Sequence, residues 1–194
     1  MKKVVLLLVF LFTAVGVGMA QQVDKASKKA EKAAKKAEKA AKKAAEEAEE
    51  MALFEKAVRA LETRDFVLEA DRVEFKRGSY AFVTPSTNFV SMKGEKATVQ
   101  LAFNGALSGP NGIGGITVEG EATNVKMSTD KRGNVSFSMM VQGTAISASV
   151  TIRMVKGSNK CTATVNPNFS SNRLSFTGNL YLTQESTIFQ GRTF

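Results

Sequence analysis

The sequence contains no histidine and no tryptophan, and its single cysteine is Cys161. Without histidine the chain lacks the usual general base and the commonest metal ligand, which excludes Ser-His-Asp and Cys-His catalytic systems. A zinc site would have to combine carboxylates with one thiolate, which is not an ordinary zinc ligand set. We therefore expect no catalytic residues, no metal site and no cofactor.

A lone cysteine cannot form an internal disulfide, so the fold must be held by its hydrophobic core. Cys161 lies in the alternating run KCTATV at 160–165, which favours a small buried apolar side chain at this position. An intermolecular disulfide or a reactive thiol is the alternative.

The N-terminus has the pattern of a secretory signal peptide over residues 1–20. Lys2 and Lys3 precede an apolar run at 4–17, and Gly18 and Ala20 place small residues at −3 and −1 before Gln21. The pattern predicts export to the periplasm or cell envelope. The apolar run is shorter than the about 20 residues of a membrane span, so no transmembrane span is expected after cleavage; an uncleaved anchor is the alternative. The residue directly after the cleavage site is Gln21 and not the cysteine of a lipoprotein, which argues against a lipid anchor.

The charge is positive but diffuse. The formal net charge is +9, and two of these charges leave with Lys2 and Lys3. A spread excess of this kind gives weak attraction to anionic surfaces, and an envelope protein is the other partner that we consider. It does not form the basic stripe of a nucleic-acid-binding protein, so no nucleic acid partner is expected.

Residues 21–50 are rich in Lys, Ala and Glu, and the heptad KAEKAAK occurs at 29–35 and again at 36–42. Ala, Lys and Glu are strong helix formers, and Glu38 stands four residues before Lys42. The pattern predicts a solvated helical spacer. Weak self-association through 24–61 is the alternative, because apolar positions recur at coiled-coil spacing. These positions are Ala30, Ala33, Ala37, Ala40, Ala44, Met51, Phe54, Val58 and Leu61, with Glu47 as the one interruption.

The segment 51–194 is predicted to be a β domain that begins with a docking helix at 51–64. Met51, Phe54, Val58 and Leu61 form an apolar stripe on that helix, and strand patterns follow without a linker. Short polar turns separate alternating runs, which indicates antiparallel hairpins. We expect a mainly β fold, an antiparallel sandwich or barrel of about 8–10 strands, preceded by a long N-terminal α-helix. Strands are expected near 66–75, 79–84, 87–92, 96–103, 116–127, 134–142, 145–155, 160–165, 173–182 and 187–190.

One glycine-rich stretch, at 105–115, is the candidate functional loop. It lacks the GK[ST] of a phosphate loop, and a strand follows it where a dinucleotide site would need a helix. It is either a connection between two long strands or a loop at a ligand mouth or partner surface. The candidate residues are Gly109, Pro110, Asn111, Gly112, Gly114 and Gly115.

Two carboxylate pairs are spaced for one strand face: Glu69 with Asp71, and Glu119 with Glu121. Residues at i and i+2 on a strand stand about 7 Å apart, a separation that some glycosidases use. A solvated outer face is the simpler interpretation of both pairs.

Several phrases in the β half together resemble the DUF4251 family, a domain of unknown function in exported proteins of the Bacteroidetes. They are TNFV at 87–90, ATVQLAF at 97–103, GPNGIGGITV at 109–118 and NPNFSSNR at 166–173. The resemblance runs from about residue 50 to the C-terminus, and it implies an envelope or periplasmic location and a mostly β domain. It implies no activity, and no functional residue carries over from it.

The sequence leads to one main functional hypothesis and two alternatives. The main one is a non-enzymatic exported protein that binds a partner or ligand through its β domain. The first alternative is a carrier with a cavity for a small apolar ligand inside a barrel. The second is a hydrolase that uses carboxylates alone.

Overall fold

The computed structural model describes residues 2–102, 114–144, 147–168 and 173–191, and it describes side chains from residue 32 onward. The chain divides into two compact units, Met1–Ala48 and Glu49–Phe194. One helix, α1 (Lys2–Glu62), supplies the first unit and the beginning of the second.

The first unit is helical throughout its described part, as the Lys/Ala/Glu composition predicts. Every side chain from Lys32 to Glu50 is exposed. Lys43 pairs with Glu47 at 3.4 Å, and Lys42 pairs with Glu46 at 3.9 Å rather than with Glu38. Such exposed pairs add about 0.3–0.5 kcal/mol each, so propensity is the main local source of this helix.

The last turns of α1 belong to the second unit and are buried on one face. Phe54, Ala57, Ala60 and Leu61 share a single hydrophobic cluster with strand residues of the β domain. Their spacing of three and four residues places them on one stripe of the helix. The helix ends where Arg64 adopts a left-handed conformation, with φ of 55°. The Arg64 carbonyl then accepts a hydrogen bond from the Gly94 N–H at 2.8 Å, which fixes the helix end against the turn between β3 and β4.

Phe54→Ala should lower the free energy of unfolding of the β domain by about 3 kcal/mol, because the ring leaves a cavity in a shared core. Removal of residues 21–48 should leave the melting temperature nearly unchanged, because the side chains from Lys32 onward in that segment are exposed. Thermal and urea unfolding of both variants beside a parent chain that begins at Gln21 measure this. A deletion that unfolds the domain, or a Phe54→Ala chain as stable as the parent, would contradict it.

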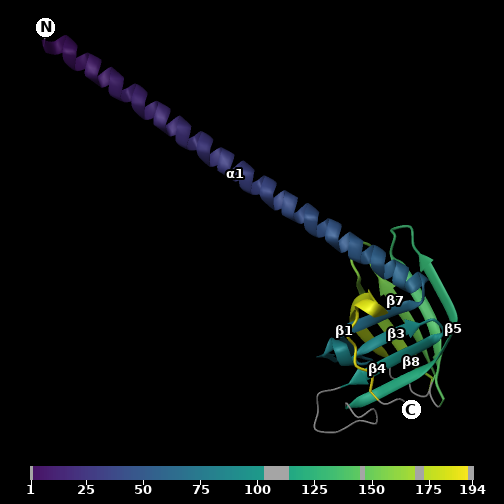
Figure 1. Cartoon of the computed structure of the whole chain (residues 1–194). Helices are drawn as coiled ribbons and strands as arrows, with labels where there is room; N and C mark the ends of the chain where they lie inside the picture. Colours follow the sequence, from purple (N-terminus) through teal and green to yellow (C-terminus); the bar gives the residue numbers. More distant parts are fainter. Residues whose placement is uncertain (1, 103–113, 145–146, 169–172, 192–194) are drawn as a thin grey trace. The chain divides into compact units, whose positions relative to one another are not determined.

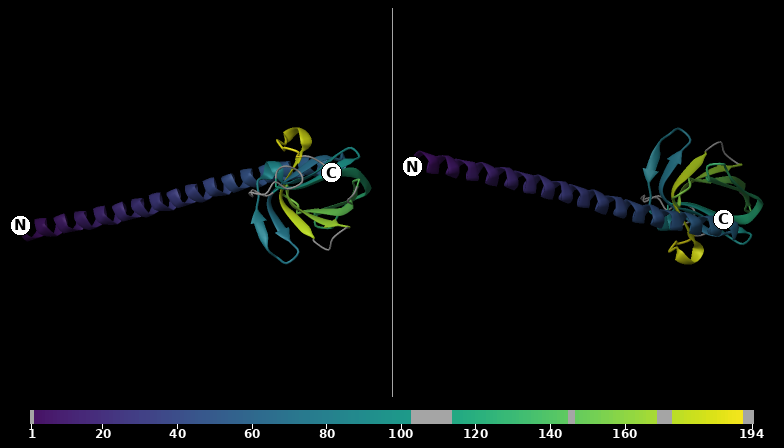
Figure 2. Two further views of the ribbon diagram at one scale, coloured as in Figure 1. Left: turned by 90° about the horizontal axis from the view of Figure 1, so that it is seen from below. Right: turned by 90° about the horizontal axis from the view of Figure 1, so that it is seen from above.

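The second unit is a closed antiparallel barrel of eight strands, so the barrel and not the sandwich is the correct form (Figures 1 and 2). β1 pairs with β3, and from β3 to β9 each strand pairs with the next strand in the chain. The barrel closes because β9 also pairs with β1, along Phe66–Phe75. The strands are β1 (Asp65–Phe75), β3 (Phe89–Lys93), β4 (Lys96–Ala102), β5 (Gly115–Thr129), β6 (Val135–Gln142), β7 (Ser147–Met154), β8 (Lys160–Pro167) and β9 (Leu174–Leu182). A ninth, short strand, β2 (Tyr80–Phe82), pairs with the far end of β1.

The barrel core follows from strict alternation along the strands. In β6 and β7 every second residue is buried, and the residues between them are mostly Ser and Thr on the outside. Phe66 and Phe137 meet edge to face in the core, with ring centroids 5.4 Å apart.

One expected strand does not form. Residues 187–190 have no strand structure; after η2 (Thr183–Glu185) they run as an irregular segment over the outside of β3 and β4, shown in yellow in Figure 1. The Phe189 N–H donates to the Ser86 carbonyl at 2.8 Å, and the other contacts of this segment are to side chains. The apolar pair Ile188-Phe189 resembles a strand in sequence, but no described strand forms a ladder with it.

Candidate functional site

The glycine-rich candidate loop lies mostly outside the described residues. Gly109, Pro110, Asn111 and Gly112 belong to that part, while Gly114 and Gly115 are described at the start of β5. A Cβ atom at Gly115 would overlap the carbonyl oxygen of Leu101 on the neighbouring strand. Glycine at 115 is therefore required for the close approach of β4 to β5. The close packing of these two strands explains the glycine without a role in binding.

These two glycines nevertheless locate a particular end of the barrel. The α1 end contacts the turn that joins β3 to β4, so the C-terminal end of β4 and the start of β5 lie at the opposite end. Antiparallel pairing places the start of β9 and the end of β8 there as well. We call this end, away from the helix, the open mouth.

Inward-facing apolar side chains at the open mouth are less buried than those deeper in the barrel. Ile116 is 39% exposed although it faces the same way as the core residue Ala122 on its strand. Leu174 at the start of β9 is half-buried, whereas Phe176, one step deeper, is fully buried. The partly buried apolar side chains at this end are Phe75, Val83, Leu101, Val118 and Leu174.

The depth of this apolar region is limited by the packing beneath it. Val73 and Phe176 are both fully buried and pair with each other across the β1–β9 seam. Two residues along a strand span about 7 Å, so burial becomes complete within that distance of Phe75 and Leu174. The described interior is therefore filled beneath this outer apolar layer.

A second feature lies on the outer face of β3, β4 and β5, where polar residues are unexpectedly buried. Gln100 and Thr117 are fully buried there, and the C-terminal segment bonds directly to Gln100. Asn88, just before β3, is 1% exposed and is held by the Thr84 carbonyl and the Ala102 N–H. Gln100 Nε2 donates to the carbonyls of Thr87 at 3.0 Å and Phe189 at 2.7 Å. Its Oε1 accepts from Thr117 Oγ1 at 2.9 Å and from the Gly191 N–H at 2.7 Å. Both donors and both lone pairs of this amide are thus used, two of them to hold the C-terminal segment and two to bond Thr87 and Thr117.

The candidate carboxylate pairs also serve the C-terminal segment. Glu69 accepts a hydrogen bond from Ser186 Oγ at 2.5 Å, and Glu119 accepts one from Gln190 Nε2 at 2.8 Å. A register shift between Ala70 and Arg72 places Asp71 at an irregularity of β1, so Glu69 and Asp71 do not form a regular same-face pair. Each candidate pair thus has one carboxylate that already accepts a hydrogen bond from the C-terminal segment.

A surface hollow of about 460 Å³ lies beside the β5–β6 turn. Asp130, Asn134 and Arg153 are its most polar lining residues. The hydrogen bond from the Asn134 side chain, followed by backbone N–H donors of the same turn, lowers the pKa of Asp130 below its ordinary value. These bonds, at 2.8–2.9 Å, close the turn on itself, so they explain Asp130 without a ligand.

Cys161 is buried, and burial raises the pKa of its thiol far above the ordinary value. A neutral thiol in the core is a poor nucleophile, which fits the buried apolar interpretation over the reactive one. Within the described ranges no three Cys, Asp or Glu side chains gather as a metal site would require. In the same part of the chain, no helix offers an apolar stretch of the length that crossing a membrane demands.

Comparison with known proteins agrees with the barrel and its family. The chain is similar to a DUF4251 family protein from Bacteroides eggerthii DSM 20697 of known crystal structure, with 46% sequence identity and a TM-score of 0.65. The alignment covers 76% of this chain and 99% of that one. No curated protein matches the sequence. The sequence profile of DUF4251, described as a domain of unknown function, matches residues 48–180, so the chain belongs to the DUF4251 family.

Proposed function

We propose that this chain is an exported, non-enzymatic binding protein whose barrel takes a small apolar ligand, or an apolar side chain of a partner, at its open mouth. The observation that carries the proposal is the gradient of burial along the inward-facing side chains, from Ile116 and Leu174 at the mouth to Phe176 within. Ligand sites are lined mostly by apolar side chains, and this incompletely buried layer supplies such side chains at one end of the barrel.

The filled layer beneath the mouth and the bonds of the carboxylates bear on the two alternative functions, a ligand carrier and a hydrolase. A carrier for a small apolar ligand fits the barrel if the ligand stays within the outer layer, because the layer beneath is filled by Val73 and Phe176. A hydrolase is supported less, because Glu69 and Glu119 already accept hydrogen bonds from the C-terminal segment. The absence of histidine from the sequence also leaves no side chain that titrates near neutral pH as an unperturbed general base.

Binding at the mouth is tested with Ile116→Lys in the mature chain. The neutral dye Nile red is the probe, and its fluorescence is titrated against the protein. We expect Ile116→Lys to weaken dye binding at least about tenfold, because a charge enters an apolar contact. Val155→Lys is the control: Val155 is 67% exposed beside the turn that joins β7 to β8, which lies at the helix end of the barrel.

Both variants should melt at the temperature of the parent, because both positions are exposed. Equal dye binding by the parent and Ile116→Lys would contradict the mouth as the site. Equal loss in both variants would indicate a general effect of added positive charge, and it would equally count against the mouth.

Export is tested separately by intact-mass measurement of the protein from its native envelope fraction. The small residues Gly18 and Ala20 lead us to expect a mature chain that begins at Gln21. A native chain that retains Met1 would contradict cleavage, whatever the dye experiment shows.

A further inference from the structure

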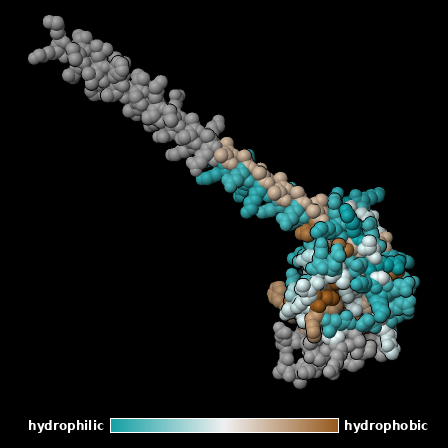
Figure 3. Space-filling view, in the orientation of Figure 1, coloured by the Kyte–Doolittle hydropathy of each residue, from teal (hydrophilic) through white to brown (hydrophobic). Residues whose placement is uncertain are grey.

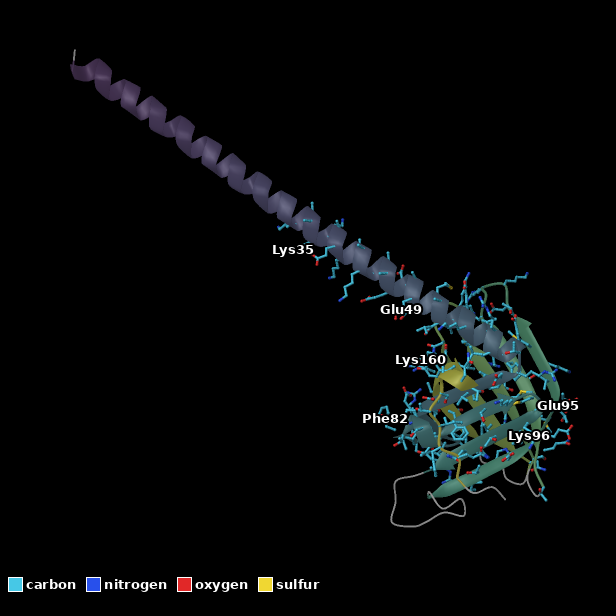
Figure 4. The ribbon with its side chains drawn as sticks, viewed as in Figure 1. Lys35, Glu49, Phe82, Glu95, Lys96 and Lys160 are labelled. Carbon is cyan, nitrogen blue, oxygen red and sulfur yellow. The ribbon has the colours of Figure 1, made fainter. Side chains whose placement is uncertain are left out.

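The strand β2 exposes a free edge and two aromatic rings. Tyr80 is 60% exposed and Phe82 is 78% exposed, and they are the most prominent apolar side chains of the barrel's surface near the end of β1. In Figure 4, Phe82 lies at the outer side of the barrel. Within the described residues, β2 stands at the end of the strand order, so no described strand pairs with its second edge.

The hydrogen-bond register shows which groups point outward from that edge. The Phe75 N–H donates to the Ser79 carbonyl, and the Val83 N–H donates to the Asp71 carbonyl. Antiparallel ladders alternate, so residues 79, 81 and 83 bond to β1 while the N–H and C=O groups of Tyr80 and Phe82 point away from it. The two exposed aromatic residues are therefore also the two residues with main-chain groups available for a further strand.

The rings stand in a fixed arrangement. Tyr80 and Phe82 meet edge to face, with centroids 5.7 Å apart. The Arg72 guanidinium lies 5.9 Å from the centre of the Tyr80 ring, a cation–π distance that holds the tyrosine over β1. An ordered aromatic pair loses little conformational freedom when a partner covers it.

We propose that this edge binds a second copy of the same chain, with the two β2 strands paired antiparallel about a two-fold axis through Ala81. Positions 80 and 82 are both aromatic, so a two-fold axis at Ala81 places an aromatic residue of one copy opposite an aromatic residue of the other. In this register Tyr80 of each copy stands opposite Phe82 of the other copy, so the pair occurs twice. Both positions carry outward main-chain groups, so four inter-chain hydrogen bonds form beneath two cross-strand aromatic pairs.

The flanking residues fit a closed dimer rather than an open fibre. Lys76 and Arg77 precede β2, and in this register Arg77 stands opposite Pro85 of the second copy, so the basic residues of the two copies do not face each other. Pro85 has no N–H and ends the pairing on that side. On the face visible in Figure 3, the described surface of the β domain is mainly hydrophilic, with small separate apolar areas.

The first test is sedimentation of the mature chain over about a hundredfold range of concentration. We expect a monomer–dimer equilibrium in the parent and in the control Val155→Ser, and monomer alone in Phe82→Pro. Proline at 82 removes an N–H that points away from β1 and keeps the bonds of residues 81 and 83 to β1, so the hairpin is retained. Unchanged circular dichroism would confirm that.

The second test uses Ala81→Cys. The two Ala81 residues form a non-hydrogen-bonded antiparallel pair in the proposed dimer, with Cα atoms about 4.5 Å apart, within reach of a disulfide. We expect oxidation to give a covalent dimer with Ala81→Cys and none with Val155→Cys. The native thiol, Cys161, is buried and does not interfere.

A parent chain that stays monomeric throughout, or a dimer that persists in Phe82→Pro, overturns the proposal. The first result would leave the edge to an extended segment of another protein, and the second would place self-association elsewhere, such as the heptads of 24–61. Failure of either test leaves the mouth site untouched, since Ile116 is on β5 and takes no part in this edge.

Discussion

Replacing Gly178 by alanine should prevent the barrel from closing. Gly178 lies on β9 opposite Ala70 of β1 and Cys161 of β8, at the seam where the last strand meets the first. A Cβ atom there would overlap the carbonyl oxygen of Glu69 and press on the Cα atom of Ala70. Both atoms are backbone and cannot rotate away, so the seam itself must separate.

We expect Gly178→Ala to cost more than about 4 kcal/mol of unfolding free energy, at the upper end of single substitutions. Urea unfolding followed by circular dichroism measures it. Ser175→Ala, on the outward side of the same strand, is the matched control and should stay within about 0.5 kcal/mol of the parent. A Gly178→Ala chain as stable as this control would show that the seam is more adaptable than its close contact indicates.

Gln100→Ala should release the C-terminal segment and lower stability by about 4 kcal/mol. The substitution leaves the carbonyls of Thr87 and Phe189, the hydroxyl of Thr117 and the N–H of Gly191 without their common partner. A buried group that loses its partner costs about 1–3 kcal/mol, and water entering beneath a loosened segment recovers part of the total.

Urea unfolding measures the loss, and hydrogen exchange at Phe189 and Gly191 reports release of the segment directly. Gln142→Ala, an exposed glutamine on β6, is the control and should change neither quantity. Slow exchange at Gly191 in Gln100→Ala would show that Glu69 and Glu119 suffice to hold the segment.

The strands were predictable to within a few residues because their alternation is regular. The strands expected at 134–142 and 160–165 lie at Val135–Gln142 and Lys160–Pro167. The choice between sandwich and barrel was not predictable, because alternation identifies the buried face of each strand and not its partners. Closure depends on the pairing of β1 with β9, which joins opposite ends of the domain.

The candidate site was only partly accessible to sequence reasoning. The glycine-rich stretch led to the open mouth through Gly114 and Gly115, but the mouth's apolar side chains come from separate strands that share no local motif. Gln100 was missed altogether. It alternates with apolar neighbours like any outward polar residue, and only the path of the C-terminal segment explains its burial.

The closure of β1 with β9 also sets the order in which this protein can fold. Phe66 pairs with Leu182 and Phe75 with Leu174, so the seam joins residues that are far apart in the chain. Contacts of such long sequence separation slow folding, because the loop must close before they contribute. While β9 is still inside the machinery that makes or translocates the chain, the remaining strands form at most an open sheet. For the export that we propose, this order means that the chain would cross its membrane before the barrel exists and would complete its folding on the far side.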